Sequence, residues 1–295
     1  MTLPRMVLHN DYVLISHPCT QRQFLLRPDE ETNNILAYCI SYAVQEYGML
    51  LIGALAESNH EHTLLKDPEG NYPAFLAWYH SYVARILNVR WGRSENLWST
   101  KQVSAVRLVG RRAVIRKLVY LFANPVKDML VERACQWPGF STYRNFLNGT
   151  PLRARRPHRY FSRTGQMPAT IELALVIPED LGPRDEFIAE VRAGVHEVER
   201  KMALYRARTG RRVLGRRAIF AQSWRGAPTQ PRKQSSIRPT VAGDRDGRLK
   251  ALDLQAWFYE QRRAAWLRWC AGLPAVFPPG TYKLVRRLLA VPIAG

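Results

Sequence analysis

Residues 49–66 read MLLIGALAESNHEHTLLK, in which two apolar runs flank a short polar segment. The two runs predict neighbouring strands, 49–56 and 60–66, joined by a turn. Side chains two residues apart on a strand point to the same side of its sheet, so His60 and His62 can face one metal ion. This stretch therefore predicts a β-hairpin that carries two candidate metal ligands.

The segments around the hairpin alternate between strand and helix patterns. The spacing of apolar residues predicts, in chain order, strand 6–16, a helix that begins at Pro28 and ends at Gly48, the hairpin, a helix from Asn71, strand 97–108 and helix 113–123. This order is a split β-α-β arrangement. We therefore expect the α+β class, with an antiparallel sheet and helices on one of its faces.

Two further polar side chains come from the predicted helix 113–123. Tyr120 and Asn124 are four residues apart, a spacing that places side chains on one face of a helix. Pro125 predicts that Asn124 is the last residue of that helix. Two imidazoles, an amide oxygen and a phenol around one cation would form a phosphoryl-transfer site. The alternative is a surface pair of histidines, a core tyrosine and an Asn-Pro helix end, none of them with a chemical role.

The charge of the chain points to a polyanionic partner. The 295 residues hold 44 Lys and Arg against 24 Asp and Glu, which gives a net charge of +20 and a pI near 10.3. Residues 151–295 contribute +16 (28 against 12), whereas residues 1–150 contribute +4 (16 against 12). So uneven an excess favours nucleic acid as the partner over a surface that is basic only for solubility.

Cysteine spacing argues against a protein stabilised by zinc or disulfides, and hydropathy argues against a membrane protein. The four cysteines lie far apart without paired spacing, so neither a zinc knuckle nor a disulfide framework is expected. The longest apolar run, Tyr47 to Ala56, is about half as long as a bilayer-spanning helix, and the first thirty residues contain no signal-like apolar core. We expect a soluble, cytoplasmic protein without a membrane partner.

The pattern predicts two regions joined by a linker. Residues 1–148 hold the elements described above, 149–169 form an Arg- and Pro-rich linker, and 170–295 form a basic, mainly helical extension. In the extension, apolar spacing predicts a helix over 186–207 that ends at Gly210. A basic segment follows, with the arginines Arg211, Arg212, Arg216 and Arg217. This helix and segment predict either a helix-turn-helix that contacts DNA phosphates or a solvated basic extension.

A set of motifs between about Tyr12 and Tyr143 carries a family resemblance. The motifs are Phe24-Leu25-Leu26-Arg27-Pro28, Asn59-His60-Glu61-His62, Asn88, Leu97-Trp98, Tyr120-x-x-x-Asn124-Pro125-Val126-Lys127, Leu130-Val131 and Trp137-Pro138-x-x-Ser141. In order and spacing they resemble the single-tyrosine HUH transposases of small insertion sequences, especially the REP-associated tyrosine transposases. The resemblance covers about half of the chain and implies the ferredoxin-like, RRM-like HUH fold.

The resemblance also implies an activity. His60 and His62 correspond to the paired metal ligands of that family. Tyr120 corresponds to its nucleophile, and Asn124 to a polar third ligand. The implied reaction cleaves and rejoins single-stranded or hairpin DNA through a 5′-phosphotyrosine, with Mg²⁺ or Mn²⁺ as the cofactor. A tyrosine ester conserves the energy of the phosphodiester, so strands can be exchanged without ATP. Whether the protein acts as a monomer or a homodimer stays open.

One position departs from the pattern of the family. Glu61 stands between the two histidines, where the family has a bulky hydrophobic residue that faces the covered side of the sheet. A buried carboxylate needs a partner, a raised pKa or a solvated cleft. Two alternative functions follow from this departure and from the metal motif. One is a domesticated or decayed relative that only binds DNA, and the other is a metal phosphodiesterase that uses water instead of tyrosine.

Three tryptophans are candidates for contacts with unpaired bases. Single-stranded nucleic acid leaves the faces of its bases free to stack on aromatic side chains. Trp78, Trp91 and Trp98 lie in the region that carries the resemblance. The alternative for each of them is ordinary packing in the core.

Overall fold

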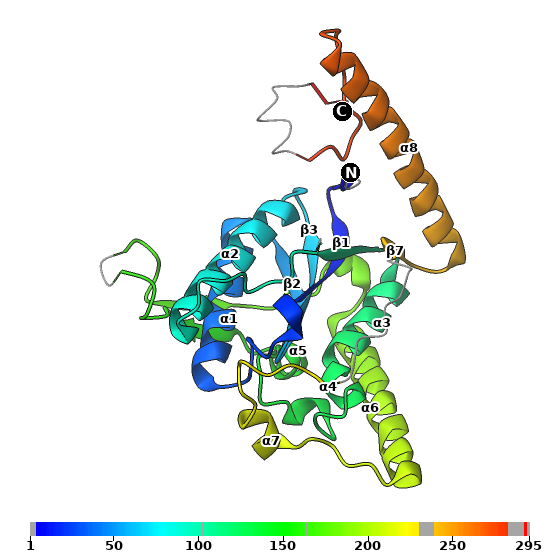
Figure 1. The fold of residues 1–295 in the computed structure, drawn as a ribbon. Coiled ribbons are helices and arrows are strands. Elements are labelled where there is room, and N and C mark those ends of the chain that lie inside the picture. Colours follow the sequence, from blue (N-terminus) through cyan, green and yellow to red (C-terminus); the bar gives the residue numbers. More distant parts are fainter. Residues whose placement is uncertain (1–3, 102, 163–164, 230–238, 283–291, 294–295) are drawn as a thin grey trace.

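A five-stranded sheet forms the centre of the protein (Figure 1). The computed structural model describes residues 4–101, 103–162, 165–229, 239–282 and 292–293. The strands of the sheet are β1 Asp11–Pro18, β2 Leu50–Glu57, β3 His60–Asp67, β4 Ser104–Leu108 and β7 Val241–Ala242. Their order is β2-β3-β1-β4-β7, and neighbouring strands run antiparallel except for β4 and β7. The predicted hairpin is therefore β2 and β3.

Helices connect and cover these strands. In chain order they are α1 Glu30–Glu46, α2 Tyr72–Trp91, α3 Arg111–Phe122, α4 Asn124–Lys127, α5 Tyr143–Asn148, α6 Arg184–Thr209, α7 Arg216–Phe220 and α8 Arg245–Cys270. Short 3-10 helices lie at Thr20–Arg22, Ala134–Gln136 and Glu179–Leu181. None of the described helices has the length and apolar character of a membrane span. The order of strands and helices confirms the predicted α+β class and split β-α-β arrangement.

Helices lie on both faces of the sheet rather than on one, which extends the prediction (Figure 1). The face that receives Val13 and Ile15 of β1 is covered by α1 and α2. The opposite face, which receives Tyr12 and Leu14, is covered by α3 and α6. The strand β1 is apolar on both of its sides, and each apolar face of a sheet has to be removed from water. The second layer brings α3, with Tyr120, onto the face that is opposite to α1 and α2.

Two local features differ from the predicted pattern. The strand β4 forms only over Ser104–Leu108, while Trp98 in the preceding segment is buried and pairs with Cys19 in an isolated bridge. The helix α3 ends at Phe122, so Asn124 begins α4 instead of ending α3. Both differences concern the end of an element. The two histidines stand at the start of β3, as in the predicted strand 60–66.

The segment that was predicted as a linker contains sheet structure. The strands β5 (Leu152–Arg155) and β6 (Thr170–Leu173) pair with each other in an antiparallel two-stranded sheet. Leu152 and Ala154 of β5 pack into the same core cluster as the inner face of α1. Burial of these apolar side chains explains why the segment is ordered, although residues 163–164 lie outside the described part.

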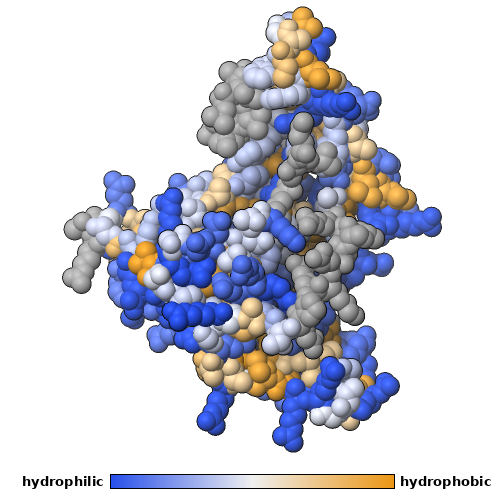
Figure 2. Space-filling model, in the orientation of Figure 1, coloured by the Kyte–Doolittle hydropathy of each residue, from blue (hydrophilic) through white to orange (hydrophobic). Residues whose placement is uncertain are grey.

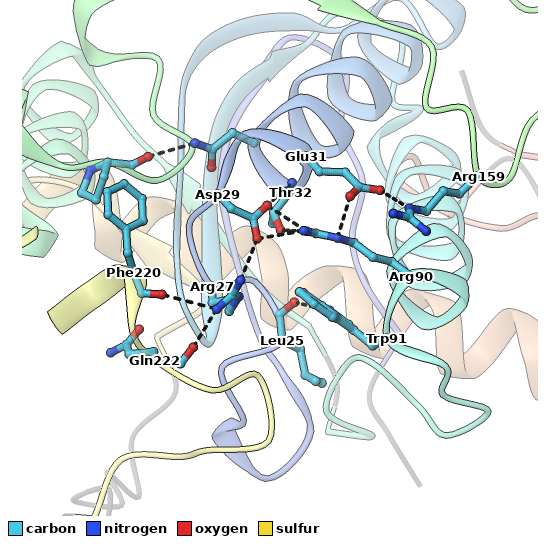
Figure 3. A network of polar contacts seen from close by, with 12 residues as sticks. Leu25, Arg27, Asp29, Glu31, Thr32, Arg90, Trp91, Arg159, Phe220 and Gln222 are labelled. Atoms are coloured by element: carbon cyan, nitrogen blue, oxygen red, sulfur yellow. Dashed lines mark hydrogen bonds and ion pairs between the residues drawn. The ribbon is translucent and has the colours of Figure 1, made fainter. Parts of the chain in front are cut away.

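A network of charged side chains holds α1 and α2 together (Figure 3). Asp29 caps α1 by accepting a hydrogen bond of 2.8 Å from the Thr32 amide. Its two oxygens also accept hydrogen bonds of 2.8 and 2.9 Å from Arg90 near the end of α2. Burial opposes ionisation of Asp29, but these donors, Arg90 first, hold the pKa of its carboxyl group below the usual range. The ion pair between Asp29 and Arg90 therefore fixes the start of α1 against the end of α2.

The same network also fixes a later part of the chain (Figure 3). Arg27 donates hydrogen bonds to the backbone carbonyls of Phe220 and Gln222, at 3.3 and 3.0 Å. The hydroxyl of Ser58, in the turn between β2 and β3, donates to the side chain of Gln222. These hydrogen bonds hold the segment around α7 at the end of the sheet that contains the turn between β2 and β3.

Candidate active site

The histidine pair begins β3 and faces α3. In the sheet, His62 is opposite Ser16 of β1, and His60 is opposite Pro18. The two imidazole rings lie 4.8 Å apart between centroids and are nearly perpendicular, at 86°. The prediction that both rings share one side of the sheet is therefore confirmed by the geometry.

Hydrogen bonds at Nδ1 orient both imidazoles. Nδ1 of His60 lies 2.8 Å from Oδ1 of Asn59, which only accepts hydrogen bonds, so this nitrogen carries the proton. Nδ1 of His62 lies 2.6 Å from the hydroxyl oxygen of Ser16, which is able to accept. In these tautomers both Nε2 atoms present a lone pair. A partner at Nδ1 that leaves Nε2 as the electron-pair donor is typical of metal-binding histidines.

Asn124 closes the cluster from the other side. Its Nδ2 lies 3.0 Å from Nε2 of His60 and 3.5 Å from Nε2 of His62, and the residue is only 4% exposed. The nitrogen and oxygen of a carboxamide are exchanged by a half-turn of the amide group, which would point Oδ1 at both imidazoles. Three polar atoms thus converge on one point, as the sequence predicted for His60, His62 and Asn124.

The spacing of these atoms fits a divalent cation. Two ligands at about 2.1 Å from one ion and at right angles lie about 3.0 Å apart, close to the observed separations. Two imidazoles and one amide oxygen suit Mn²⁺ and are compatible with Mg²⁺. In the described part of the chain, no three His, Cys, Asp or Glu side chains group as a metal site. At this position Asn124 is the third side chain, beside the two imidazoles, that could contribute a ligand atom.

Tyr120 lies beside this cluster and at the surface. Its ring is 5.5 Å from the ring of His62 between centroids, and the residue is 36% exposed. Nζ of Lys127 is 4.2 Å from the centroid of the phenol ring, and Nζ of Lys117 is 5.7 Å from it. Burial, followed by the charges of neighbouring cations, lowers the pKa of Lys117. The phenol is thus accessible, next to the imidazoles and next to two cationic groups that attract a phosphate.

Two carboxyl groups behind the cluster were not foreseen from the sequence. Burial raises the pKa of Glu57 well above its usual value, and the nearby charge of Asp128 adds to the effect. Burial also raises the pKa of Asp128, which shares a hydrogen bond with Glu57. Oε1 of Glu57 is buried without a hydrogen-bond partner, and Oε2 lies 3.9 Å from Nδ1 of His60. A cation held by His60, His62 and Asn124 would lower both pKa values, because a nearby positive charge stabilises the carboxylate form.

Glu61 points to the opposite side of the sheet, as strand alternation predicted. It is 2% exposed and accepts hydrogen bonds from the hydroxyl of Tyr79 and from Nε2 of His80, both on α2. Nδ1 of His80 in turn lies 3.3 Å from Nδ1 of His17. Glu61 therefore has the partners that a buried carboxylate needs, and it is no ligand of the cluster formed by His60 and His62.

The predicted basic segment pairs with the backbone that follows α4. The amides of Leu214 and Gly215 donate to the carbonyls of Met129 and Leu130, at 2.8 and 3.0 Å, just after α4. The four arginines of the segment are exposed: Arg211, Arg212, Arg216 and Arg217. The alternative of a helix-turn-helix is not formed, because α7 has only five residues and is too short to act as a recognition helix.

All three candidate tryptophans pack against other side chains of the protein. Trp98 is buried and donates to the carbonyl of His80, and Trp78 is stacked between Tyr42 and Tyr82. Trp91 is half-buried and stacks on a tryptophan of the returning segment, Trp224, at 5.7 Å between centroids. Arg93 and Arg225 lie over the Trp224 ring, at 5.7 and 4.8 Å. Sequence spacing gave no signal for Trp224, which comes from a distant part of the chain.

Comparison with solved structures finds similar chains at low identity. One is the structure of a REP-associated tyrosine transposase bound to a REP hairpin, with a TM-score of 0.43, 16% identity, and coverage of 60% of this chain and 99% of that chain. Another is a transposase candidate from Deinococcus radiodurans R1, with a TM-score of 0.30, 17% identity, and coverage of 40% of this chain and 95% of that chain. No family model and no curated protein matches the sequence.

Proposed function

We propose that this protein is a transposase-class DNA strand transferase that uses Tyr120 as its nucleophile and depends on a divalent metal. The observation that carries the proposal is the meeting of an accessible phenol with the converging side chains of His60, His62 and Asn124. The strand β3, which supplies both histidines, is distant in the chain from the consecutive helices α3 and α4, which supply Tyr120 and Asn124. Core packing gives no reason for an exposed tyrosine at this place, and the motif resemblance agrees with the assignment.

The chemistry is a transesterification at a DNA phosphate. The Tyr120 oxygen forms a bond to phosphorus while the bond from phosphorus to the 3′-oxygen breaks, and the phenolic proton passes to solvent. The leaving oxygen takes a proton from water, which gives a 5′-phosphotyrosine and a free 3′-hydroxyl. A second 3′-hydroxyl reverses the step and joins new strands. A Mg²⁺ or Mn²⁺ ion held by His60, His62 and Asn124 would supply positive charge to the non-bridging and leaving oxygens.

Other residues of the chain would hold the DNA. Lys117 and Lys127 flank the phenol ring and would attract the phosphate that reacts. The four exposed arginines of residues 211–217 would contact further phosphates, since their segment is hydrogen-bonded to the backbone of Met129 and Leu130, which follow α4.

A covalent adduct tests the proposal directly. The full-length protein, incubated with end-labelled single-stranded hairpin DNA and Mn²⁺, should give a protein–DNA band that survives SDS. Tyr120→Phe should abolish the band because the attacking oxygen is lost, and EDTA should do the same. Tyr205→Phe, which alters an equally exposed tyrosine on α6, serves as the matched control and should leave the band intact.

The same assay separates the other functions. A protein that binds the hairpin without forming any adduct or product would support the decayed, DNA-binding relative. Cleaved product without an adduct, equally abundant with Tyr120→Phe, would support a phosphodiesterase that activates water. Either outcome overturns the assignment of Tyr120 as the nucleophile.

A further inference from the structure

The helix α8 projects from the rest of the protein and buries only one narrow side (Figure 1). Over Arg245–Cys270 its buried residues are Ala251, Phe258 and Ala265, spaced seven apart. Ala265 packs against Ala275 and Phe277, which follow the helix. Large apolar side chains lie exposed elsewhere on α8, and Figure 2 shows hydrophobic residues gathered at its outer side, on the right of the view. A helix with such a surface has a second contact to make.

One line of residues along α8, away from the buried side, has heptad spacing and includes the exposed apolar residues Leu249, Leu252 and Trp266. Other apolar side chains are exposed off this line: Leu254, Trp257, Leu267 and Trp269. We define the heptad stripe as Leu249, Leu252, Ala256, Tyr259, Arg263, Trp266 and Cys270, at alternating spacings of three and four. Leu252 is 38% exposed and Trp266 is 39% exposed. Spacings of three and four give the 3.5-residue period with which two helices pack along a common seam. A helix of 26 residues is about 39 Å long, which accommodates more than three heptads.

The charges that flank the stripe specify both the partner and its direction. The charged positions on one flank of the stripe are acidic, Asp253 and Glu260, and those on the other flank are basic, Arg248 and Arg262. The remaining flank positions are uncharged: Gln255, Leu267 and Trp269. In a parallel pair of identical helices, the basic flank of one faces the acidic flank of the other five residues further on, which sets Arg248 opposite Asp253 of the second copy. An antiparallel pair would instead bring like charges together.

We propose that α8 pairs with α8 of a second copy of this chain as a parallel, two-stranded coiled coil. This homodimer is independent of the proposed chemistry at Tyr120. Arg263 is the one charged residue in the stripe, and a single charged residue in such a seam fixes the register at some cost in stability. Its long side chain reaches solvent beside the seam.

Variants of exposed residues on the one helix test the pairing. In sedimentation equilibrium, the full-length protein should be a dimer at micromolar concentration. Leu252→Glu with Trp266→Glu should raise the dimer dissociation constant at least tenfold, because both side chains lie in the seam. Leu254→Glu with Trp257→Glu is the matched control, since these residues are 39% and 44% exposed but lie off the stripe. Circular dichroism verifies that all variants keep the helix content of the parent.

Cross-linking tests the direction of the helices. A parallel pair places the exposed Cys270 next to its copy, so mild oxidation should give a cross-linked dimer that Cys270→Ser abolishes. The background variant Cys135→Ser removes the other cysteine that is not fully buried. Arg248→Glu should weaken the dimer, and added Asp253→Arg should restore it. A dimer without the Cys270 cross-link would overturn the parallel arrangement.

Three other results would overturn the pairing itself. The first is a protein that is monomeric at all concentrations tested. The second is a dimer whose dissociation constant is unchanged by Leu252→Glu with Trp266→Glu. The third is a monomer that binds vesicles of anionic phospholipid through the same two residues, which would make α8 a membrane-surface helix.

Discussion

Nδ2 of Asn124 lies 3.0 Å from Nε2 of His60, although 64 positions separate these two residues in the chain. His60 is the first residue of β3, and Asn124 is the first residue of α4. Polar groups that are brought together and buried need partners that satisfy them. A cation between the imidazoles and the amide oxygen would satisfy all of them at once, and this has a measurable consequence.

Asn124→Ala should weaken Mn²⁺ binding by about tenfold or more. The reason is that one of three protein ligands is lost, and even the loss of a ligand's supporting partner costs 10- to 100-fold. Isothermal titration of the full-length protein with MnCl₂ measures the effect without reference to activity. Asn148→Ala, at an exposed position at the end of α5, should bind Mn²⁺ as the parent does. If Asn124→Ala bound Mn²⁺ with the affinity of the parent protein, Asn124 would not be a metal ligand.

Glu61→Ala should lower the free energy of unfolding by about 3 kcal/mol, because the buried donors on Tyr79 and His80 lose their acceptor. Urea unfolding followed by tryptophan fluorescence measures the change. Glu95→Ala is the control, since Glu95 is exposed in the loop after α2 and should unfold like the parent. If both variants unfolded at the same urea concentration, the hydrogen bonds to Glu61 would contribute little to the fold.

The parts of the site that follow a local period could be predicted from the sequence. His60 and His62 share a side because a strand has a period of two residues. Tyr120 and Asn124 both reach the imidazoles even though α3 ends between them, because α4 starts directly and continues the turn. Glu61 was correctly expected on the covered face, and its partners Tyr79 and His80 lie on the helix that provides the cover.

The parts that depend on contacts between distant segments could not be predicted. Asp128 approaches Glu57 only because α4 packs beside the end of β2, and no spacing in the sequence encodes this distance. Trp224 meets Trp91 because the chain returns to the edge of the sheet after α7. The paired strands β5 and β6 were obscured by the Arg- and Pro-rich composition of the segment that connects them.

Acid should destabilise the protein through His17. Burial, and then the charge of His80, lower the pKa of His17 from 6.5 to about 4. The folded state therefore binds fewer protons than the unfolded state between these two values, so stability is fully present above pH 6.5 and is lost as the pH falls towards 4. The shift corresponds to at most about 3 kcal/mol, which urea titrations at stepped pH would measure.

The variant His17→Phe isolates this contribution. The ring of His17 is stacked on Trp98 at 4.8 Å between centroids, so phenylalanine keeps the aromatic packing and removes the titrating group. Glu61, Arg5 and the carbonyl of Ser99 also face His17, and they are unchanged in this variant. The loss of stability between pH 6.5 and 4 should become smaller in His17→Phe. His196→Phe, at an exposed position on α6, should keep the slope of the parent.

Removal of the four arginines in residues 211–217 should weaken binding of single-stranded DNA at all sequences alike. Each phosphate contact contributes about 0.7 to the slope of log K against log salt for a single strand, so loss of four contacts should reduce that slope by up to about 3. Fluorescence anisotropy at several NaCl concentrations measures it. The control removes the same charge at exposed positions in β5 and α6: Arg153, Arg155, Arg184 and Arg200. Both variants lose the same net charge, so their general electrostatic attraction to DNA falls equally. A difference between their salt slopes therefore reports direct phosphate contacts by the arginines of residues 211–217. Equal slopes in the two variants would show that the basic segment attracts DNA by charge alone and does not hold it at Tyr120.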